Sequence, residues 1–400
     1  MSFSPTHQKD YRICFLGGAR YAQPLSSTHQ KKFALLKNLG DIHVVGFSLN
    51  WQPQYFQEEA HFYLLPNLPL PILRYMLFLT ITPGILLGLI LRHRVNIIIA
   101  QSPYEALAAL WIKNLVKLWS YPLYLVVESH GDFENYLFLQ RQVFLPLIYK
   151  KIMQSVAHIT LGQADVLRSI SQATQTQLKQ YSCGQPIVEF MAWTDVSVFW
   201  AAGSRRECRG LTVIYVGVLI PRKGVHHLIN AFAQAVKSVP AGQLKIIGRP
   251  ENRDYAQTLK AQVDQSDLQD KVLFLPEMPQ QELADEMAQS AVLVLPSVSE
   301  GLGRVLVEAM AAGTPVIGTQ VGGIPDIIQE GLTGFLVPPA DEHILAQKIT
   351  YLLEHPEQVS EMGQRGREFV QTYFSPEIYY QGYEKICQLC LQSHEGTATN

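Results

Sequence analysis

The residues best suited to chemistry lie in one stretch, Ser297–Gly323, where two glutamates flank a glycine-rich loop. An apolar run ends before Glu300, and a predicted helix begins near Arg304 and carries Glu308 about one turn in. Glycines let a backbone approach a ligand closely, and the first N–H groups of a helix bind phosphate. Carboxylates accept hydrogen bonds from a vicinal diol such as ribose. The stretch therefore predicts a site for phosphate and ribose, whereas the glutamate spacing alone would fit two surface residues.

A second stretch, VGVLIPRKG at 216–224, offers a cation for the same ligand. It follows a predicted strand and turns at Arg222, Lys223 and Gly224. A lysine opposite a helix N-terminus neutralises a departing pyrophosphate. The alternative is an Arg-Lys pair that only contacts water.

The first half of the chain contributes two weaker signals, the pair Gly17-Gly18 and His130 in ESHGDF. The glycines are expected to end the strand at 11–18, and His130 follows the strand at 123–129. Side chains at the carboxyl ends of parallel strands face a ligand site more often than the core. A simple glycine turn and a surface histidine beside Asp132 remain the alternatives.

These residues need elements to hold them, and apolar strand-like runs alternate with helical ones along the whole chain. Short continuous apolar runs are typical of parallel strands covered on both faces, and the alternation predicts a doubly wound sheet. The pattern restarts after about residue 195 with strands at 211–217, 243–249, 271–276, 291–297, 314–319 and 334–338. The fold class is therefore α/β, with two Rossmann-like domains whose parallel sheets face each other across a cleft.

With these segments in place, the chain resembles family 4 of the retaining glycosyltransferases, the glycosyl transferases group 1, which have the GT-B fold. EGLGRVLVE at 300–308 matches the family's E-x7-E donor motif, and GTPVIGT, GGIPD and GLTGFLVPPAD also match. The resemblance covers nearly the whole chain. It implies that Glu300 contacts the transferred sugar, that Glu308 binds the ribose hydroxyls, and that the donor also touches Leu302, Gly303, Arg304 and Val305.

The same resemblance assigns the other residues and the domains. Lys223 matches the lysine on the donor diphosphate, His130 the histidine that touches the transferred sugar, and Gly17 and Gly18 the glycine loop near donor and acceptor. The expected domains are an acceptor-side domain at 1–197 and a donor domain at 205–375. A final helix at about 376–392 is expected to pack back on the first domain.

One position departs from the family. An arginine usually follows the first glycine of the lysine loop, and here Val218 stands in its place. We expect Arg222 or Arg304 to supply the missing charge, with Val218 still beside the donor.

The resemblance implies transfer of a hexose-type sugar from a nucleoside-diphosphate sugar, such as a UDP- or GDP-sugar, to an acceptor hydroxyl with retention. The products would be polysaccharides, glycolipids or other cell-surface glycans. Nothing resembles an Asp-x-Asp metal clamp, so no metal and no other cofactor is expected. A sugar-nucleotide epimerase and a non-catalytic sugar-nucleotide-binding subunit are the alternatives.

The composition of the chain limits which binding partners and which cellular location are expected. The formal net charge is −2, which gives no reason to expect a nucleic-acid partner, and the five cysteines suggest no disulfide framework. The first ten residues show no signal-peptide pattern, so a cytoplasmic location is expected. The 17 residues between Arg74 and Arg92 carry no charge. A buried helix is the favoured interpretation, ahead of a helix lying in the membrane interface, and a membrane-spanning helix comes last. An interfacial helix would allow peripheral membrane contact, as would the excess of Lys and Arg over Asp and Glu in residues 1–195.

Overall fold

The structure, a computed structural model, describes residues 11–134, 146–205, 210–251 and 253–395. The segment on which the signal-peptide expectation rests, 1–10, and one of the five cysteines, Cys208, lie outside the described residues. The chain divides into two compact units: unit 1 is Met1–Trp193 with Pro376–Asn400, and unit 2 is Thr194–Ser375. The cleft expected between the two domains stays a prediction.

Unit 1 is built on an eight-stranded sheet with the order β3-β4-β2-β1-β5-β6-β7-β8. All neighbouring strands are parallel except β3 and β4. The strands are β1 (Tyr11–Tyr21), β2 (Gly40–Ser48), β3 (Gln54–Gln57), β4 (His61–Leu65), β5 (Ile97–Ala100), β6 (Tyr124–Ser129), β7 (Val166–Ser169) and β8 (Ile187–Glu189). The helices are α1 (Ser27–Leu36), α2 (Pro71–His93), α3 (Ala106–Lys117), α5 (Pro146–Gly162), α6 (Gln172–Tyr181) and α14 (Pro376–Glu395), with a short 3-10 turn η1 (Lys37–Leu39) after α1.

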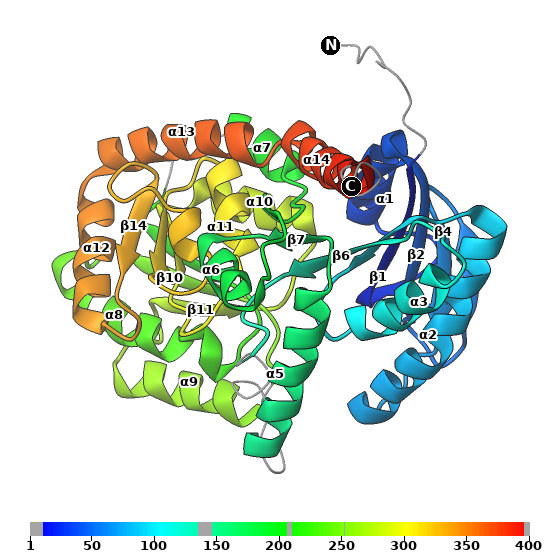
Figure 1. Ribbon diagram of the computed structural model, residues 1–400. Coiled ribbons are helices and arrows are strands. Elements are labelled where there is room, and N and C mark those ends of the chain that lie inside the picture. Colours follow the sequence, from blue (N-terminus) through cyan, green and yellow to red (C-terminus); the bar gives the residue numbers. More distant parts are fainter. Residues whose placement is uncertain (1–10, 135–145, 206–209, 252, 396–400) are drawn as a thin grey trace. The chain divides into compact units, whose positions relative to one another are not determined.

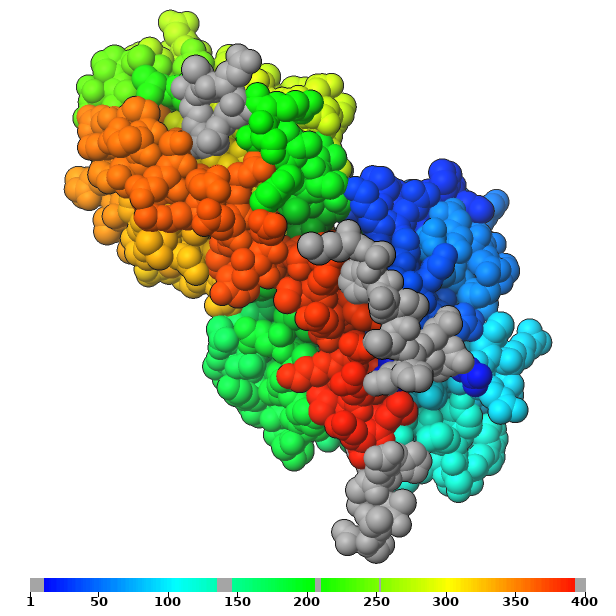
Figure 2. All heavy atoms as spheres, turned by 90° about the horizontal axis from the view of Figure 1, so that it is seen from above, coloured from blue at the N-terminus to red at the C-terminus, as the bar shows by residue number. Residues whose placement is uncertain are grey.

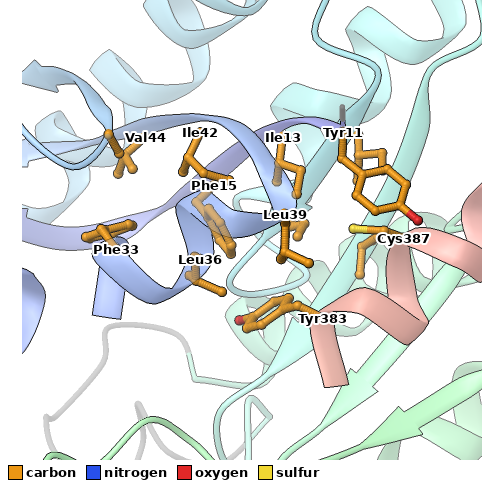
Figure 3. Close-up of a cluster of buried hydrophobic side chains, with 14 of the residues drawn as sticks. Tyr11, Ile13, Phe15, Phe33, Leu36, Leu39, Ile42, Val44, Tyr383 and Cys387 are labelled. Carbon is orange, nitrogen blue, oxygen red and sulfur yellow. The ribbon is translucent and has the colours of Figure 1, made fainter. Parts of the chain in front are cut away.

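Apolar side chains on both faces of this sheet are buried, as continuous apolar strands require. One of the two clusters includes residues from both ends of the chain. Figure 3 shows Tyr383 and Cys387 of α14 beside Phe15 of β1 and Leu36 of α1. The red helix in Figures 1 and 2 therefore belongs to unit 1, although the whole of unit 2 precedes it in sequence.

Unit 2 is built on a six-stranded parallel sheet with the order β11-β10-β9-β12-β13-β14. Numbered within the unit, this is the 3-2-1-4-5-6 order of a Rossmann sheet. Its strands are β9 (Thr212–Val216), β10 (Gln243–Ile247), β11 (Val272–Leu275), β12 (Val292–Leu295), β13 (Val316–Thr319) and β14 (Gly334–Val337). The helices are α7 (Ser197–Ser204), α8 (Val225–Ser238), α9 (Arg253–Gln265), α10 (Gln280–Gln289), α11 (Arg304–Ala311), α12 (Glu342–Glu354) and α13 (Pro356–Tyr373), and the 3-10 turns are η2 (Pro221–Lys223) and η3 (Ile324–Asp326).

Two expectations about unit 1 need correction. The strand expected to end at Gly17-Gly18 continues to Tyr21, and its pairing with β2 shifts register between Leu16 and Arg20. The glycines thus occupy an irregularity within β1, because residues without a Cβ tolerate such a break in the ladder.

The uncharged segment forms α2, which is only partly buried. One face, including Phe78, Leu86 and Leu89, packs into the core. In the most apolar 18-residue stretch of the helix, however, only 22% of the residues are buried. By length and composition α2 is the one described helix apolar enough to cross a membrane. The favoured interpretation, a buried helix, therefore holds for one face of α2 only.

Candidate functional site

The predicted donor residues lie where the strand order of unit 2 reverses. Strands β9 and β12 are hydrogen-bonded neighbours in the sheet, although β10 and β11 separate them in sequence. Their following segments, Gly217–Gly224 and Pro296–Gly303, leave the same edge of the sheet and diverge to opposite faces. Ligands of open α/β sheets bind at such a switch point.

These two loops lie directly against each other. The amide of Val298 donates to the carbonyl oxygen of Arg222 at 2.8 Å, and Arg222 Nη1 donates to the carbonyl oxygen of Ser299 at 2.8 Å. Gly224 has a φ of 67°, and a Cβ there would stand 2.0 Å from the carbonyl oxygen of Pro296. Only glycine fits this crossing, so the loop geometry explains the residue that ends RKG.

The crossing brings the two predicted catalytic groups of unit 2 together. Lys223 Nζ forms an ion pair with Glu300 Oε2, and the side chains are 17% and 13% exposed, respectively. Ser297 Oγ donates to Glu300 Oε2 at 3.3 Å, and the amide of Gly301 donates to Glu300 Oε1 at 3.2 Å. Hydrogen bonds to an ionised carboxylate hold it in one orientation. The loops after β9 and β12 therefore carry one cation, Lys223, and one anion of fixed orientation, Glu300.

The predicted phosphate-binding residues include the start of α11. Gly303, with a φ of 83°, is the residue before the helix, and no side chain among the described residues caps its N-terminus. Leu302 is buried, Arg304 is exposed and Val305 is half-buried. The first amides of a helix lack a carbonyl partner one turn earlier, although that of Leu306 donates to the carbonyl oxygen of Gly303, and the helix dipole favours an anion at this end.

Glu308 lies in the second turn of α11 and is half-buried. Burial raises the pKa of its carboxyl to about 7, and the guanidinium of Arg304 opposes that shift only in part. Carboxyl groups with a pKa raised this far occur often in ligand-binding and catalytic sites. Glu308 lies one helical turn beyond Arg304.

Val218 lies in the same loop as Lys223 and brings no charge. Its carbonyl oxygen accepts a hydrogen bond from Tyr215 Oη at 3.1 Å, which fixes the loop after β9. Arg222, which the sequence suggested as a replacement cation, is directed to the backbone of Ser299. Arg304 projects at the surface of the helix start.

The other predicted residues, Gly17, Gly18 and His130, belong to unit 1. The pairing of β1 with β5 runs from Ile13 to Leu16, so Gly17 and Gly18 come directly after it, at the switch point of the unit 1 sheet. A Cβ on Gly17 would stand 2.1 Å from Oε1 of Gln101, which follows β5. The two glycines therefore let the β1 backbone lie close to the residues after β5.

Glu105 lies at the same switch point but was not predicted from the sequence as a site residue. Burial raises the pKa of its carboxyl to about 7, opposed by a hydrogen bond from the amide of Gly18. Its Oε2 is buried and has no hydrogen-bond partner among the described residues. The signal in the sequence was an acidic residue five positions beyond the all-apolar strand β5.

His130 follows β6 and rests on a buried ion pair. Its Nε2 lies 2.8 Å from Glu128 Oε2, and Glu128 Oε1 accepts from Arg168 Nη1 at 2.8 Å and from Tyr383 Oη at 2.7 Å. Burial alone would raise the pKa of Glu128, but Arg168, His130 and Tyr383 hold it well below its usual value. Glu128 and Arg168 were missed, although a charged residue inside an apolar strand is a recognisable signal.

The predicted site residues thus form two sets. Those of unit 2 meet around the β9 and β12 loops and α11, whereas Gly17, Gly18 and His130 lie at the carboxyl edge of the unit 1 sheet. Each set occupies the edge at which parallel α/β sheets bind ligands. The roles given to the individual residues stay predictions.

Comparisons with known proteins agree with this description. Residues 203–369, which include the whole site of unit 2, match the family model of the glycosyl transferases group 1. N-acetyl-alpha-D-glucosaminyl L-malate synthase of Bacillus anthracis is 39% identical over 164 residues, 41% of this chain and 42% of that protein. The GDP-mannose-dependent monoacylated alpha-(1-6)-phosphatidylinositol monomannoside mannosyltransferase of Corynebacterium glutamicum is 30% identical over 244 residues, 56% of this chain and 62% of that protein. The chain spans less than two thirds of the length of both relatives.

Solved structures resemble the chain over almost all of its length. Sucrose-phosphate synthase from Thermosynechococcus elongatus has a TM-score of 0.75 at 21% identity, over 96% of this chain and 100% of that one. The HepE protein of Anabaena, solved in complex with UDP, has a TM-score of 0.72 at 18% identity, over 94% and 99%. The fold is therefore GT-B, and residues 203–369 match the glycosyl transferases group 1.

Proposed function

We propose that this protein transfers a hexose-type sugar from a nucleoside-diphosphate sugar to an acceptor hydroxyl, with retention of the anomeric configuration. The observation that carries the proposal is the ion pair of Lys223 and Glu300 beside the uncapped start of α11. A cation and free helix amides at one switch point suit a diphosphate, and they lie in the segment that matches the family.

In this proposal the bond between the anomeric carbon and the β-phosphate oxygen breaks, and its electron pair leaves with the phosphate. The charge of the transition state grows on that oxygen, so Lys223 and the α11 amides stabilise it more than they stabilise the bound donor. The acceptor oxygen attacks the anomeric carbon on the face that the phosphate leaves. Its proton passes to the departing phosphate, which accounts for retention without a protein nucleophile.

The two glutamates bind different parts of the donor in this proposal. Glu300, fixed by Ser297 and Gly301, is suited to the hydroxyls of the transferred sugar. Glu308 is suited to the ribose hydroxyls, because an ionised carboxylate accepts two hydrogen bonds from a diol. His130, held by Glu128, offers a further polar contact to the sugar.

A thermal-shift screen with UDP-, GDP- and ADP-sugars tests donor binding, since a ligand of the folded state raises the melting temperature. One relative is named as GDP-mannose-dependent, and the HepE structure contains UDP, so both nucleotides are included. Each stabilising donor is then incubated with candidate acceptor glycans and glycolipids. Sugar transfer is expected. Appearance of an epimer of the donor without transfer would favour an epimerase, and binding with neither reaction would favour a non-catalytic subunit.

We further propose that the acceptor is met at a membrane surface. Helices α2 and α5 both follow the carboxyl edge of the unit 1 sheet, and their first turns expose Ile72, Leu73, Leu147 and Ile148 by more than half. Lysines 150 and 151 accompany the apolar residues of α5. Apolar side chains interspersed with basic residues favour an anionic membrane surface.

Co-sedimentation with vesicles of phosphatidylcholine, with and without about 30% phosphatidylglycerol, tests this contact. The protein should pellet with the anionic vesicles, and the double variant Ile72→Ser, Ile148→Ser should not. Leu118→Ser is the matched control, because Leu118 is at least as exposed as Ile72 and Ile148 but follows the far end of α3. Equal pelleting of all three proteins would contradict the membrane proposal without affecting the proposed donor chemistry.

A further inference from the structure

Metal-binding side chains gather at the amino-terminal edge of the unit 1 sheet, away from the edge that carries the predicted site. His43 of β2 and His61 of β4 are register partners on neighbouring strands. Asp41 precedes His43 on the same face of β2, and His93 is the last residue of α2, which covers that face. His43 is completely buried, whereas Asp41 is exposed and His93 half-buried.

The distances in this cluster are short. Asp41 Oδ2 lies 3.0 Å from His43 Nε2, and the ring centroids of His43 and His93 are 4.7 Å apart. One ligand atom from each of Asp41, His43 and His93 lies within 4.8 Å of the others. His61 stacks on the ring of His43 at 5.0 Å, and its Nε2 is 3.7 Å from Asp41 Oδ1. Stacked rings do not converge on one point, so His61 supports the cluster from outside.

We propose that Asp41, His43 and His93 bind one Zn²⁺ ion, with water in the fourth position. Zinc ligands stand about 2.0–2.2 Å from the ion, so two of them at a tetrahedral angle are roughly 3.3 Å apart. The contact between Asp41 and His43 already has nearly that length. Side-chain movements of about 1–2 Å would bring His93 to the same spacing, with no change of backbone.

His43 combines complete burial with a carboxylate and a second imidazole at close range. Nδ1 of His43 is buried and has no hydrogen-bond partner among the described residues, so the contact with Asp41 satisfies only one of its two ring nitrogens.

Other nearby groups do not compete for the ion. Cys14 is the register partner of His43 on β1, but its Sγ points to the carbonyl oxygen of Phe15 at 3.8 Å. Tyr55 Oη lies 3.4 Å from His61 Nδ1, which further engages His61. An ion held by Asp41, His43 and His93 would tie the end of α2 to the start of β2. This role is structural and independent of the proposed transfer reaction.

Zinc competition with a chromogenic chelator tests the site on the full chain, with any affinity tag removed and after EDTA treatment. A Cys183→Ser background is used because the exposed Cys183 thiol is itself a zinc ligand. We expect one Zn²⁺ per chain, and at least about tenfold weaker binding in Asp41→Asn and in His93→Gln. Zinc should also raise the melting temperature of the parent protein more than that of either variant.

His226→Gln is the matched control. His226 is also a partly buried histidine with a second histidine at a ring distance of 4.0 Å, but it lies on α8 in unit 2. Its substitution should leave zinc binding unchanged. Circular dichroism checks that each variant is folded, and Asp41→Asn, an exposed change, decides the result if His93→Gln misfolds. Absence of stoichiometric binding, or binding that neither variant weakens, would overturn the proposal.

Discussion

The two sheets have the same switch-point architecture but place their charges differently. In unit 2, Lys223 and Glu300 meet on loops beyond the strands, where a ligand can reach both. In unit 1, Glu128 and Arg168 meet within neighbouring strands β6 and β7, and each is 1% exposed. In the proposed function Lys223 of the loop pair binds the donor, whereas the buried strand pair supports only its neighbour His130.

The largest effect should come from breaking the strand pair. Arg168→Met leaves the Glu128 carboxylate buried without its guanidinium, which costs about 3–5 kcal/mol of unfolding free energy. Urea denaturation measures the loss. Lys37→Met, which removes the exposed pair of Lys37 with Glu59, should cost less than about 1 kcal/mol. Similar losses in both variants would show that burial does not distinguish the two pairs.

Removing the cation of the loop pair should affect the reaction rather than stability. Lys223→Met is expected to lower kcat about 10²–10³-fold, by analogy with the loss of one donor to a transition-state oxyanion. The Kd for donor should change much less. Lys245→Met is the control, because Lys245 forms an ion pair of 2.6 Å with Glu286 in the same unit. A kcat equal to that of the control would remove Lys223 from the proposed chemistry.

Glu308→Ala should weaken donor binding by roughly ten- to a hundredfold, since it removes hydrogen bonds to a charged acceptor. Isothermal titration with the donor found in the thermal-shift screen gives the affinity. Glu282→Ala, an acidic residue in the first turn of α10, should bind donor normally. Intact affinity in Glu308→Ala would mean that the ribose is held elsewhere.

A further test concerns the arginine that is missing at Val218 in unit 2. If Arg222 or Arg304 replaces the missing arginine, Arg222→Ala or Arg304→Ala should lower turnover several-fold, which corresponds to roughly 1 kcal/mol. Steady-state rates of both variants and of the double variant measure this. The double variant is informative because in each single variant the remaining arginine can compensate for the one that is lost. Unchanged turnover in all three proteins would contradict the compensation.

The smallest effect concerns pH and stability. The pKa of Glu308 is about 7 in the folded chain, above its ordinary value of 4.5. As pH rises from 4.5 to 7, the unfolded chain loses this proton first, so the folded state loses stability over that window. Glu308→Gln should therefore raise the melting temperature at pH 8 and have less effect at pH 5. A shift of the same size at both pH values would contradict the raised pKa.

Much of unit 2 was predictable because its strands are continuous apolar runs and its site residues follow them closely in sequence. Lys223 and Glu300 lie on different loops, yet each loop begins at the carboxyl end of a central strand, and the topology of parallel sheets brings such ends together. The resemblance supplied the individual roles. The sequence could not show that the two side chains pair directly, because that depends on the crossing at Gly224.

Unit 1 was harder to predict because its important contacts depend on strand register. The pairing of Glu128 with Arg168 and of His43 with His61 follows from which residues face each other across β6–β7 and β2–β4. Hydrophobic periodicity indicates strands but not their register. The sequence also could not decide between a buried and an interfacial α2, because an apolar helix looks the same in sequence whether one face or all of it is covered.

The return of α14 to unit 1 has a consequence for how the protein is made. Tyr383 is the hydroxyl donor to Glu128, and Tyr379, Ile386 and Cys390 belong to the same core as β1. A ribosome synthesises these residues only after all of unit 2, so the first 193 residues emerge with an open core and an incomplete support for His130. The second unit can complete its own sheet first, and the earliest-made half of the molecule is the last to be finished.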